Sequence, residues 1–468
     1  MPLNTEFRLL TKSHQKPIFE CLFPINLLTS VRFKLINKIT YLVLSLVCVT
    51  LSSIFNDVII SVFMFYTLYL LLLLLNFSGS VTDPRGIISG FFVLYSTLYP
   101  LQALYVGYSG LPLDVYFLNE SLFISMVFFV TMTNCFNLFI YNFDKESIRG
   151  VYNYNNSKSN LSLNITFVTL SILVIISLVQ VYSSGVTSKR ELLESSNVIA
   201  NLSGFSFWVL TVVFIIKVSN SLKPLKNEEI TMPFLLIALL FMLVTGERDA
   251  FFRVVLICLF IHLDKNNGIN MIGILGMLLI AVIVAPVSQA FKAVFISGNF
   301  DLSRQGLELI LSNEFTSASR NLYAILYFDV ENDIVRIFDN FARGFLPGAL
   351  LSGFEIESGV KWFNSDFRFI NGISGNSGWG FSLVADGYIF MKELGVIIYA
   401  LIYSGTICFF HNRRLNSKYM NAFYLMLFIT SIYVIRADLS NFISQVFKIG
   451  GIAVITVYFS HRILLKKS

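Results

Sequence analysis

Long uninterrupted stretches of hydrophobic residues recur along the chain, and short polar segments separate them. A helix that crosses a bilayer needs about 20 apolar residues in a row, whereas a membrane β-strand alternates apolar and polar positions. Because the stretches are continuous, they predict membrane-spanning α-helices. We expect about twelve of them, at residues 39–55, 58–76, 87–107, 119–141, 162–182, 199–217, 231–245, 249–263, 269–297, 384–410, 419–436 and 441–463.

The basic residues predict on which side of the membrane each segment lies. Cytoplasmic loops carry an excess of Lys and Arg. Residues 1–38 contain six of these residues, whereas the segment 108–118 contains none. We therefore expect a cytoplasmic N-terminal segment, which lacks the pattern of a cleavable signal. Lysines in the last residues of the chain likewise predict a cytoplasmic tail at 464–468.

One long polar segment interrupts the alternation. Residues 298–383 separate nine predicted spans (39–297) from the last three (384–463), and they hold ten of the 27 glycines. A structureless loop of this length is unusual in a compact domain. We expect a functional insertion on the outer, periplasmic side of the membrane.

Within this loop, residues 333–345 show the spacing of an amphipathic helix. Such a helix would lie along the outer bilayer surface or against the bundle. The apolar face comprises Ile334, Ile337, Phe338, Phe341 and Phe345, and the polar face comprises Asp333, Arg336, Asp339, Asn340 and Arg343.

The composition narrows the class of protein. The chain is 55% hydrophobic and 13% charged, with a mean hydropathy of +0.72, whereas soluble proteins are about 25% charged. A soluble enzyme, a disordered protein and a disulfide scaffold are excluded, and the net charge of +6 is explained by helix-flanking Lys and Arg rather than by nucleic acid. We find no Walker motif, no G-x-S-x-G motif and no His/Cys cluster with metal-ligand spacing. We expect no cofactor and no metal.

Charged residues within or beside apolar stretches are costly in a bilayer, which makes them functional candidates. Most would face the outer side, where arginine could bind phosphate oxygens bidentately. The alternatives are a lysine that reaches the headgroups, an exposed charged turn at 247–249, and an ion pair between Arg436 and Asp438. Asp386 could instead neutralise Lys392 or cap its helix. The candidates are Glu247, Arg248, Arg253, Lys292, Asp386 and Arg436.

Aromatic residues of the loop and of the following helix start form a second group of candidates. Aromatic faces can stack on sugar rings, although anchoring at the membrane interface is their more common use. The four histidines, in contrast, all fall on the predicted cytoplasmic side, so an outward-facing base would have to be a carboxylate. The aromatic candidates are Trp362, Trp379 and Tyr388.

Three local patterns resemble the Wzy-type O-antigen polymerases, or oligosaccharide repeat unit polymerases. TGERDAFFR at 245–253 is similar to the Gly-x-Arg turn of that family, and IRADLSN at 435–441 is similar to a late Arg-containing segment. ADGYIFMKELGVIIYAL at 385–401 is similar to the start of the span after the loop, although Phe390 and Lys392 stand where the family has Asn and Gly.

The resemblance implies a bacterial inner-membrane glycosyltransferase with a GT-C-like architecture. It would transfer a glycan chain from undecaprenyl diphosphate to the non-reducing end of a lipid-linked repeat unit, at the periplasmic face. Its partners would be the two lipid-linked oligosaccharides, membrane lipids and a chain-length-regulating co-polymerase. The alternatives are an O-antigen ligase, which uses a histidine in the outer loop, another polyprenyl-phosphate glycosyltransferase, a lipid-linked oligosaccharide flippase, and a membrane receptor or scaffold.

The resemblance also implies roles for the candidates. Cationic residues would stabilise the departing diphosphate, and a carboxylate would accept the hydroxyl proton or orient the acceptor. We assign diphosphate binding first to Arg248 and Arg436 and then to Arg253 and Lys292, the carboxylate role first to Asp386 and then to Glu247, and glycan contact to Trp362, Trp379 and Tyr388.

Overall fold

All regular secondary structure in the described part of the computed structural model is helical. The described residues are 25–107, 111–142, 157–183, 198–220, 228–245, 248–266, 268–297, 314–346, 348–351, 354, 356–373 and 380–467.

A helix lies at each of the twelve positions that the hydrophobic pattern predicts. The helices before the long loop are α2 (Ile25–Phe55), α3 (Val58–Asn76), α4 (Ile87–Tyr105), α5 (Val115–Phe139), α7 (Ser157–Ser183), α9 (Val198–Asn220), α10 (Glu228–Thr245), α11 (Arg248–Lys265) and α12 (Met271–Ser297). After the loop come α19 (Leu383–Arg413), η4 (Arg414–Asn416), α20 (Lys418–Val434), α21 (Leu439–Ile443), the π-helical η5 (Ser444–Gly451) and α22 (Ile452–Lys467).

Seven helices of the described part are long and apolar enough to cross a membrane, and three shorter apolar helices accompany them. The described part of the chain is therefore all-helical and has the composition of a polytopic membrane protein. The hydrophobic pattern predicts these helices from the sequence, because each membrane crossing requires a continuous apolar run of about 20 residues.

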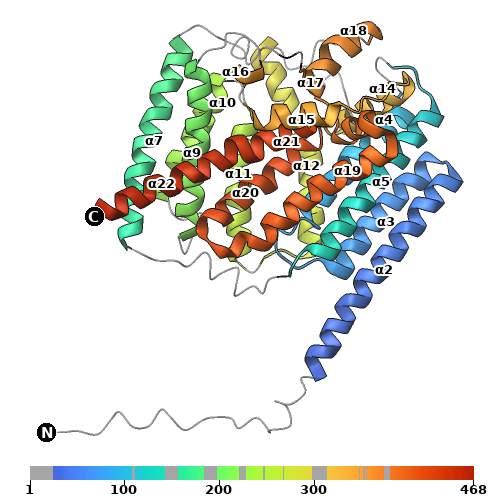
Figure 1. Ribbon diagram of the computed structural model, residues 1–468, viewed down its shortest axis with the longest axis horizontal. Helices are drawn as coiled ribbons and strands as arrows, with labels where there is room; N and C mark the ends of the chain where they lie inside the picture. Colours follow the sequence, from blue (N-terminus) through green and yellow to red (C-terminus); the bar gives the residue numbers. More distant parts are fainter. Residues whose placement is uncertain are drawn as a thin grey trace.

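The long loop forms a layer of short helices at one end of the bundle, which we call the loop end (Figure 1). The long helices lie side by side below it, and the N-terminal part of α2 projects from the opposite end (Figure 1). The described helices of the loop are η2 (Glu314–Thr316), α14 (Ser317–Tyr327), α15 (Arg336–Phe345), α16 (Gly348–Leu351), α17 (Gly359–Trp362), η3 (Phe363–Phe367) and α18 (Arg368–Ile370).

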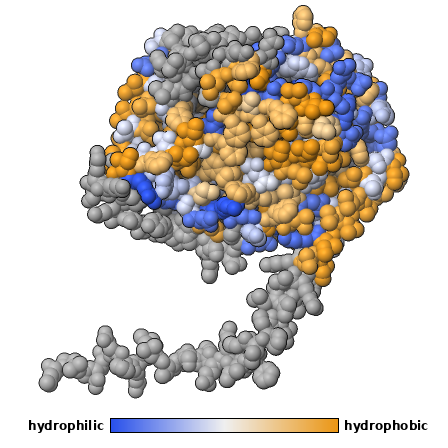
Figure 2. Space-filling model, in the orientation of Figure 1, coloured by the Kyte–Doolittle hydropathy of each residue, from blue (hydrophilic) through white to orange (hydrophobic). Residues whose placement is uncertain are grey.

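The distribution of apolar residues is that of a protein surrounded by lipid. The interior is filled by aromatic rings such as the stacked pair of Phe92 and Phe128, whose centroids are 5.0 Å apart. Large apolar residues also face outward, and the side chain of Phe63 is 70% exposed. Hydrophobic residues cover much of the visible surface in Figure 2. Exposed apolar patches of this extent mark a membrane or protein interface.

Short polar residues define the ends of several helices. Asn56, with a positive φ of 45°, turns the chain between α2 and α3. Asp57 then accepts a hydrogen bond from the backbone N–H of Ile60 at 2.9 Å. Ser382 caps α19 by accepting from the backbone N–H of Ala385 at 3.3 Å. Side-chain caps of this kind satisfy amides that have no partner within the helix.

The α19 helix contains a break eight residues after its start. Met391 and Lys392 have non-helical backbone angles, and Lys392 has a φ of +49° and a ψ of −136°. The chain approaches itself closely here, because a Cβ added at Gly395 would lie 2.0 Å from the carbonyl oxygen of Gly387. Lys392 thus occupies a backbone conformation that glycine adopts more readily than other residues.

We expect Lys392→Gly to raise the stability of the protein by about 1 kcal/mol, because it removes a Cβ from a strained backbone. Thermal unfolding of the purified protein in detergent measures the change. Lys392→Ala is the matched control, since it keeps the Cβ and removes the rest of the side chain as Lys392→Gly does, including the amine that lies 3.3 Å from the carbonyl oxygen of Val330. Equal stability of the Gly and Ala variants would contradict strain at this position.

Candidate functional site

A buried carboxylate at the start of α19 connects three elements at the loop end. Asp386 is 0% exposed. Its Oδ1 atom lies 2.5 Å from Nε of Arg336 on α15. Its Oδ2 atom accepts from Nδ2 of Asn340 at 2.8 Å and from the backbone N–H of Leu439 at 3.0 Å. Asp386 therefore holds α15 and the start of α21 against α19.

Further hydrogen bonds make this connection a network. Asn340 also donates to the hydroxyl of Tyr399 at 2.9 Å, and its Oδ1 accepts from the backbone N–H of Ser440 at 3.3 Å. Asp438 caps α21 by accepting from the backbone N–H of Asn441 at 2.8 Å. It also accepts from the backbone N–H of Val360, which brings α17 into the network. We refer to Asp386, Arg336, Asn340 and Asp438 as the Asp386 network.

The guanidinium of Arg336 lies between Asp386 and two aromatic rings. Its centre is 5.2 Å from the ring centroid of Trp362 and 5.5 Å from that of Phe381. Burial opposes the charge, but the Asp386 carboxylate outweighs it and keeps the pKa of Arg336 above its usual value. Within the described part of the chain its Nη2 atom is buried without a hydrogen-bond partner. This donor is enclosed by the protein, because a Cβ added at Gly359 would lie 2.6 Å from it.

Two other arginines meet at the same end of the bundle. Arg253 of α11 and Arg436 of the α20–α21 turn each lie 5.0 Å from the ring centroid of Tyr433. Arg253 donates to Oε1 of Gln445 at 2.9 Å, and Arg436 donates to Oε2 of Glu314 at 2.8 Å. The side chains of Arg436 and Glu314 are 20% and 29% exposed. We call Arg253, Arg436, Tyr433 and Glu314 the arginine pair site.

Backbone contacts join the two groups of residues. The backbone N–H of Phe381 donates to the carbonyl oxygen of Arg436 at 2.9 Å, while the Phe381 ring faces Arg336. Three guanidinium groups are therefore arranged around the start of α19 and the α20–α21 turn. Guanidinium groups retain their charge and bind phosphate or carboxylate oxygens through two parallel hydrogen bonds. The arrangement can stabilise an anion that approaches from the loop end.

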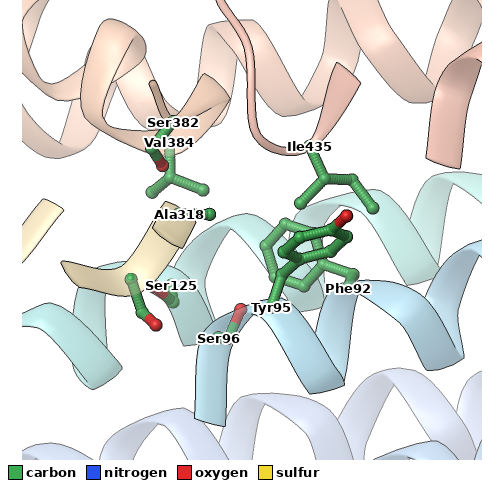
Figure 3. Close-up of a pocket in the computed structure, with 9 residues that line it drawn as sticks. Phe92, Tyr95, Ser96, Ser125, Ala318, Ser382, Val384 and Ile435 are labelled. Atoms are coloured by element: carbon green, nitrogen blue, oxygen red, sulfur yellow. The ribbon is translucent and has the colours of Figure 1, made fainter. Parts of the chain in front are cut away.

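A small cavity lies beside this region (Figure 3). Ser382 and Val384 of the α19 start, Ile435 of the α20–α21 turn and Ala318 of α14 line one side (Figure 3). The space inside it that water-sized molecules can occupy is about 10 Å³. This is room for about one water molecule and too little for a sugar. The remaining lining residues are Phe92, Tyr95, Ser96, Ser125 and Ser319.

The structure places the predicted residues as follows. Arg253 and Arg436 lie together, and Asp386 and Trp362 lie on either side of Arg336. Tyr388 packs under Lys392, whose Nζ is 4.8 Å from the ring centroid. Arg248 begins α11 and Lys292 lies in α12, but their side chains are outside the described residues, as are Glu247 and Trp379 altogether.

In the structure, the residues named in the alternatives for Asp386 and Arg436 contact other partners. Arg436 pairs with Glu314, whereas Asp438 serves as a helix cap. Lys392 lies 3.8 Å from Asp329, and Ser382 caps the helix of Asp386. Asp386 already accepts three hydrogen bonds, so its geometry favours positioning of α15 over removal of a proton from a substrate.

Arg336, Asn340 and Glu314 belong to the site but were not among the sequence candidates. Arg336 and Asn340 are spaced i, i+4 on the polar face of the amphipathic segment, and this spacing could have indicated them. Glu314 has no comparable signal, because its partner Arg436 is 122 positions away in the sequence.

A second buried polar cluster lies at the opposite end of the bundle. Asp83 and Arg85 form a salt bridge of 2.8 Å after α3, and Asp264 of α11 accepts from the hydroxyl of Thr82 at 2.6 Å. Burial would raise the pKa of Asp83, but Arg85 holds it at about 2. Arg414 also donates to Thr82. The cluster joins three segments and places two arginines beside two carboxylates, which is a structural role.

Among the described residues, no group of three or more His, Cys, Asp or Glu side chains is arranged to hold a metal ion. Comparison with known protein families, with curated proteins and with solved structures finds no match for this chain.

Proposed function

We propose that the protein is an O-antigen-polymerase-type glycosyltransferase of a bacterial inner membrane. It transfers a glycan chain from undecaprenyl diphosphate to the non-reducing sugar of a lipid-linked repeat unit and releases undecaprenyl diphosphate. The twelve helices serve as twelve spans of a GT-C-like architecture, both termini are cytoplasmic, and the loop end faces the periplasm. A chain-length-regulating co-polymerase is the expected protein partner.

The arginine pair carries this proposal. Arg253 and Arg436 come from separate helices and flank one aromatic ring, and both are partly accessible. A structural ion pair needs one cation for each carboxylate. Here Glu314 already pairs with Arg436, while the second cation, Arg253, contacts the neutral Gln445. The excess cation suits a ligand with more than one negative charge. A departing diphosphate is such a ligand, and its stabilisation is the main electrostatic requirement of the reaction.

The same residues suggest how the transfer proceeds. The acceptor hydroxyl attacks the anomeric carbon of the donor, a new C–O bond forms, and the bond from that carbon to the diphosphate oxygen breaks. Glu314 accepts the hydroxyl proton, because its carboxylate is partly exposed beside Arg436. Arg253 and Arg436 hold the charge of the diphosphate as it leaves. The bond energy of the donor drives the step, so no nucleotide is required.

The surrounding residues would bind the glycan. Trp362 is partly buried against Arg336. An aromatic face of this kind can stack on a sugar ring. The Asp386 network would keep Trp362 in place by fixing α15 and α17 to the bundle.

Deletion of the gene in its native host tests the function directly. We expect the lipopolysaccharide ladder on a gel to collapse to core with one repeat unit, because transfer to the core continues without chain growth. Re-expression of the gene should restore the ladder. Complete loss of O-antigen with accumulated lipid-linked polymer would indicate a ligase, and single units trapped on the cytoplasmic face would indicate a flippase. An unchanged ladder would contradict all three activities.

A further inference from the structure

The α15 helix of the loop has an inverted orientation. Its polar residues Arg336 and Asn340 point toward the bundle and bind Asp386. Its apolar residues point away, and the side chain of Phe338 is 69% exposed. Gly344 packs so closely that an added Cβ would lie 2.6 Å from Ile443 of α21. In a water-exposed loop this orientation would be unfavourable, because the aromatic rings would remain hydrated.

The exposed face of α15 continues onto the last long helical segment. The rings of Phe341 and Phe345 are stacked at 6.2 Å, and Phe345 lies 5.6 Å from Phe447 of η5. Further along that segment, Ile455 and Phe459 of α22 are also exposed. Hydrophobic residues extend across this side of the molecule in Figure 2.

We propose that α15 lies in the outer leaflet interface, with Phe338, Phe341 and Phe345 among the acyl chains of membrane phospholipids. Leu439–Ile463 has the length and composition of a membrane span, and the face of α15 is continuous with it, so both meet the same solvent. The amine of Lys448 donates to the carbonyl oxygen of Leu346 at 2.5 Å, at the junction of the two. Amphipathic helices lie in this plane with the apolar side inward to the lipid.

This position couples the lipid contact to the Asp386 network. The ten residues of α15 carry the aromatic face on one side and Arg336 and Asn340 on the other. A movement of the helix out of the lipid would therefore separate both residues from Asp386. The membrane surface thus helps to keep α15 and the Asp386 network in place, whatever reaction the site performs.

Spin-label accessibility tests the location. A nitroxide is attached to Phe338→Cys in a background without the native cysteines, and the protein is placed in phosphatidylethanolamine/phosphatidylglycerol nanodiscs without substrate. We expect collisions with oxygen to exceed collisions with a water-soluble nickel chelate, as at Phe459→Cys and opposite to the exposed Glu331→Cys. Phe341→Cys provides a second position on the same face. Nickel accessibility, or protection from both reagents by a second copy, would overturn the proposal.

A double-mutant cycle tests the coupling. A charge at Phe338→Asp should draw α15 toward water and lower the melting temperature in nanodiscs, whereas Phe338→Leu should have little effect. The loss from Phe338→Asp should be smaller when Asp386→Ala has already removed the network. Additive losses would overturn the coupling. Neither measurement depends on glycan transfer, so failure of the proposed function would leave both results interpretable.

Discussion

Arg436→Ala should lower glycan chain growth by about 10²–10³-fold and reduce the ladder to core with one repeat unit, because one preorganised donor to the leaving diphosphate is lost. Arg436 is only partly exposed and lies 5.0 Å from the Tyr433 ring centroid, so water replaces its charge poorly. Arg253→Ala should also lower the rate of glycan chain growth. Initial rates of polymer formation from purified lipid-linked repeat units in nanodiscs measure the change.

Two controls separate binding of the diphosphate from general damage. Arg413→Ala removes an exposed arginine at the opposite end of α19, which contacts the ring of Phe409, and it should leave the rate unchanged. Arg436→Lys keeps the charge but loses the bidentate geometry, and it should retain a small part of the activity. Wild-type rates from Arg436→Ala, with normal amounts of protein in the membrane, would remove Arg436 from the mechanism.

The sequence predicts the helices well but predicts the partners of the charged residues poorly. A spanning helix is a local property of about 20 residues, and for this reason each expected stretch coincides with a helix. The pairing of Arg436 with Glu314 depends instead on how a loop of more than 80 positions folds back on the bundle. Local patterns contain no information on such a contact.

The Asp386 network likewise combines a residue that the sequence indicates with contacts that it does not. An ionisable residue at the start of an apolar helix is a candidate from sequence alone, and Asp386 is found at the centre of a network. Three donors already occupy its oxygens, which favours a positioning role over the proton acceptance assigned from the sequence. The amphipathic spacing around Arg336 predicts a helix, but which face meets the bundle is decided by the lipid on the other side.

Asp386→Ala should destabilise the protein by about 3–5 kcal/mol, because it leaves the buried guanidinium of Arg336 without its counter-charge. The pair is separated by 2.5 Å, and the side chains are 0% and 12% exposed, so solvent screens it little. Thermal unfolding of the purified protein in nanodiscs measures the loss. Lys361→Ala is the control, since its salt bridge with Glu357 is largely exposed and contributes little.

The double variant Asp386→Leu with Arg336→Met distinguishes an unpaired charge from lost packing. Apolar residues of similar volume can replace a buried ion pair at little cost, so we expect the double variant to recover at least half of the stability lost in Asp386→Ala. The contacts of α15 and α17 with the bundle would then persist. A double variant as unstable as Asp386→Ala would show that Arg336 is not the group that makes the loss of Asp386 costly, and that the hydrogen bonds to Asn340 and Leu439 hold the network instead.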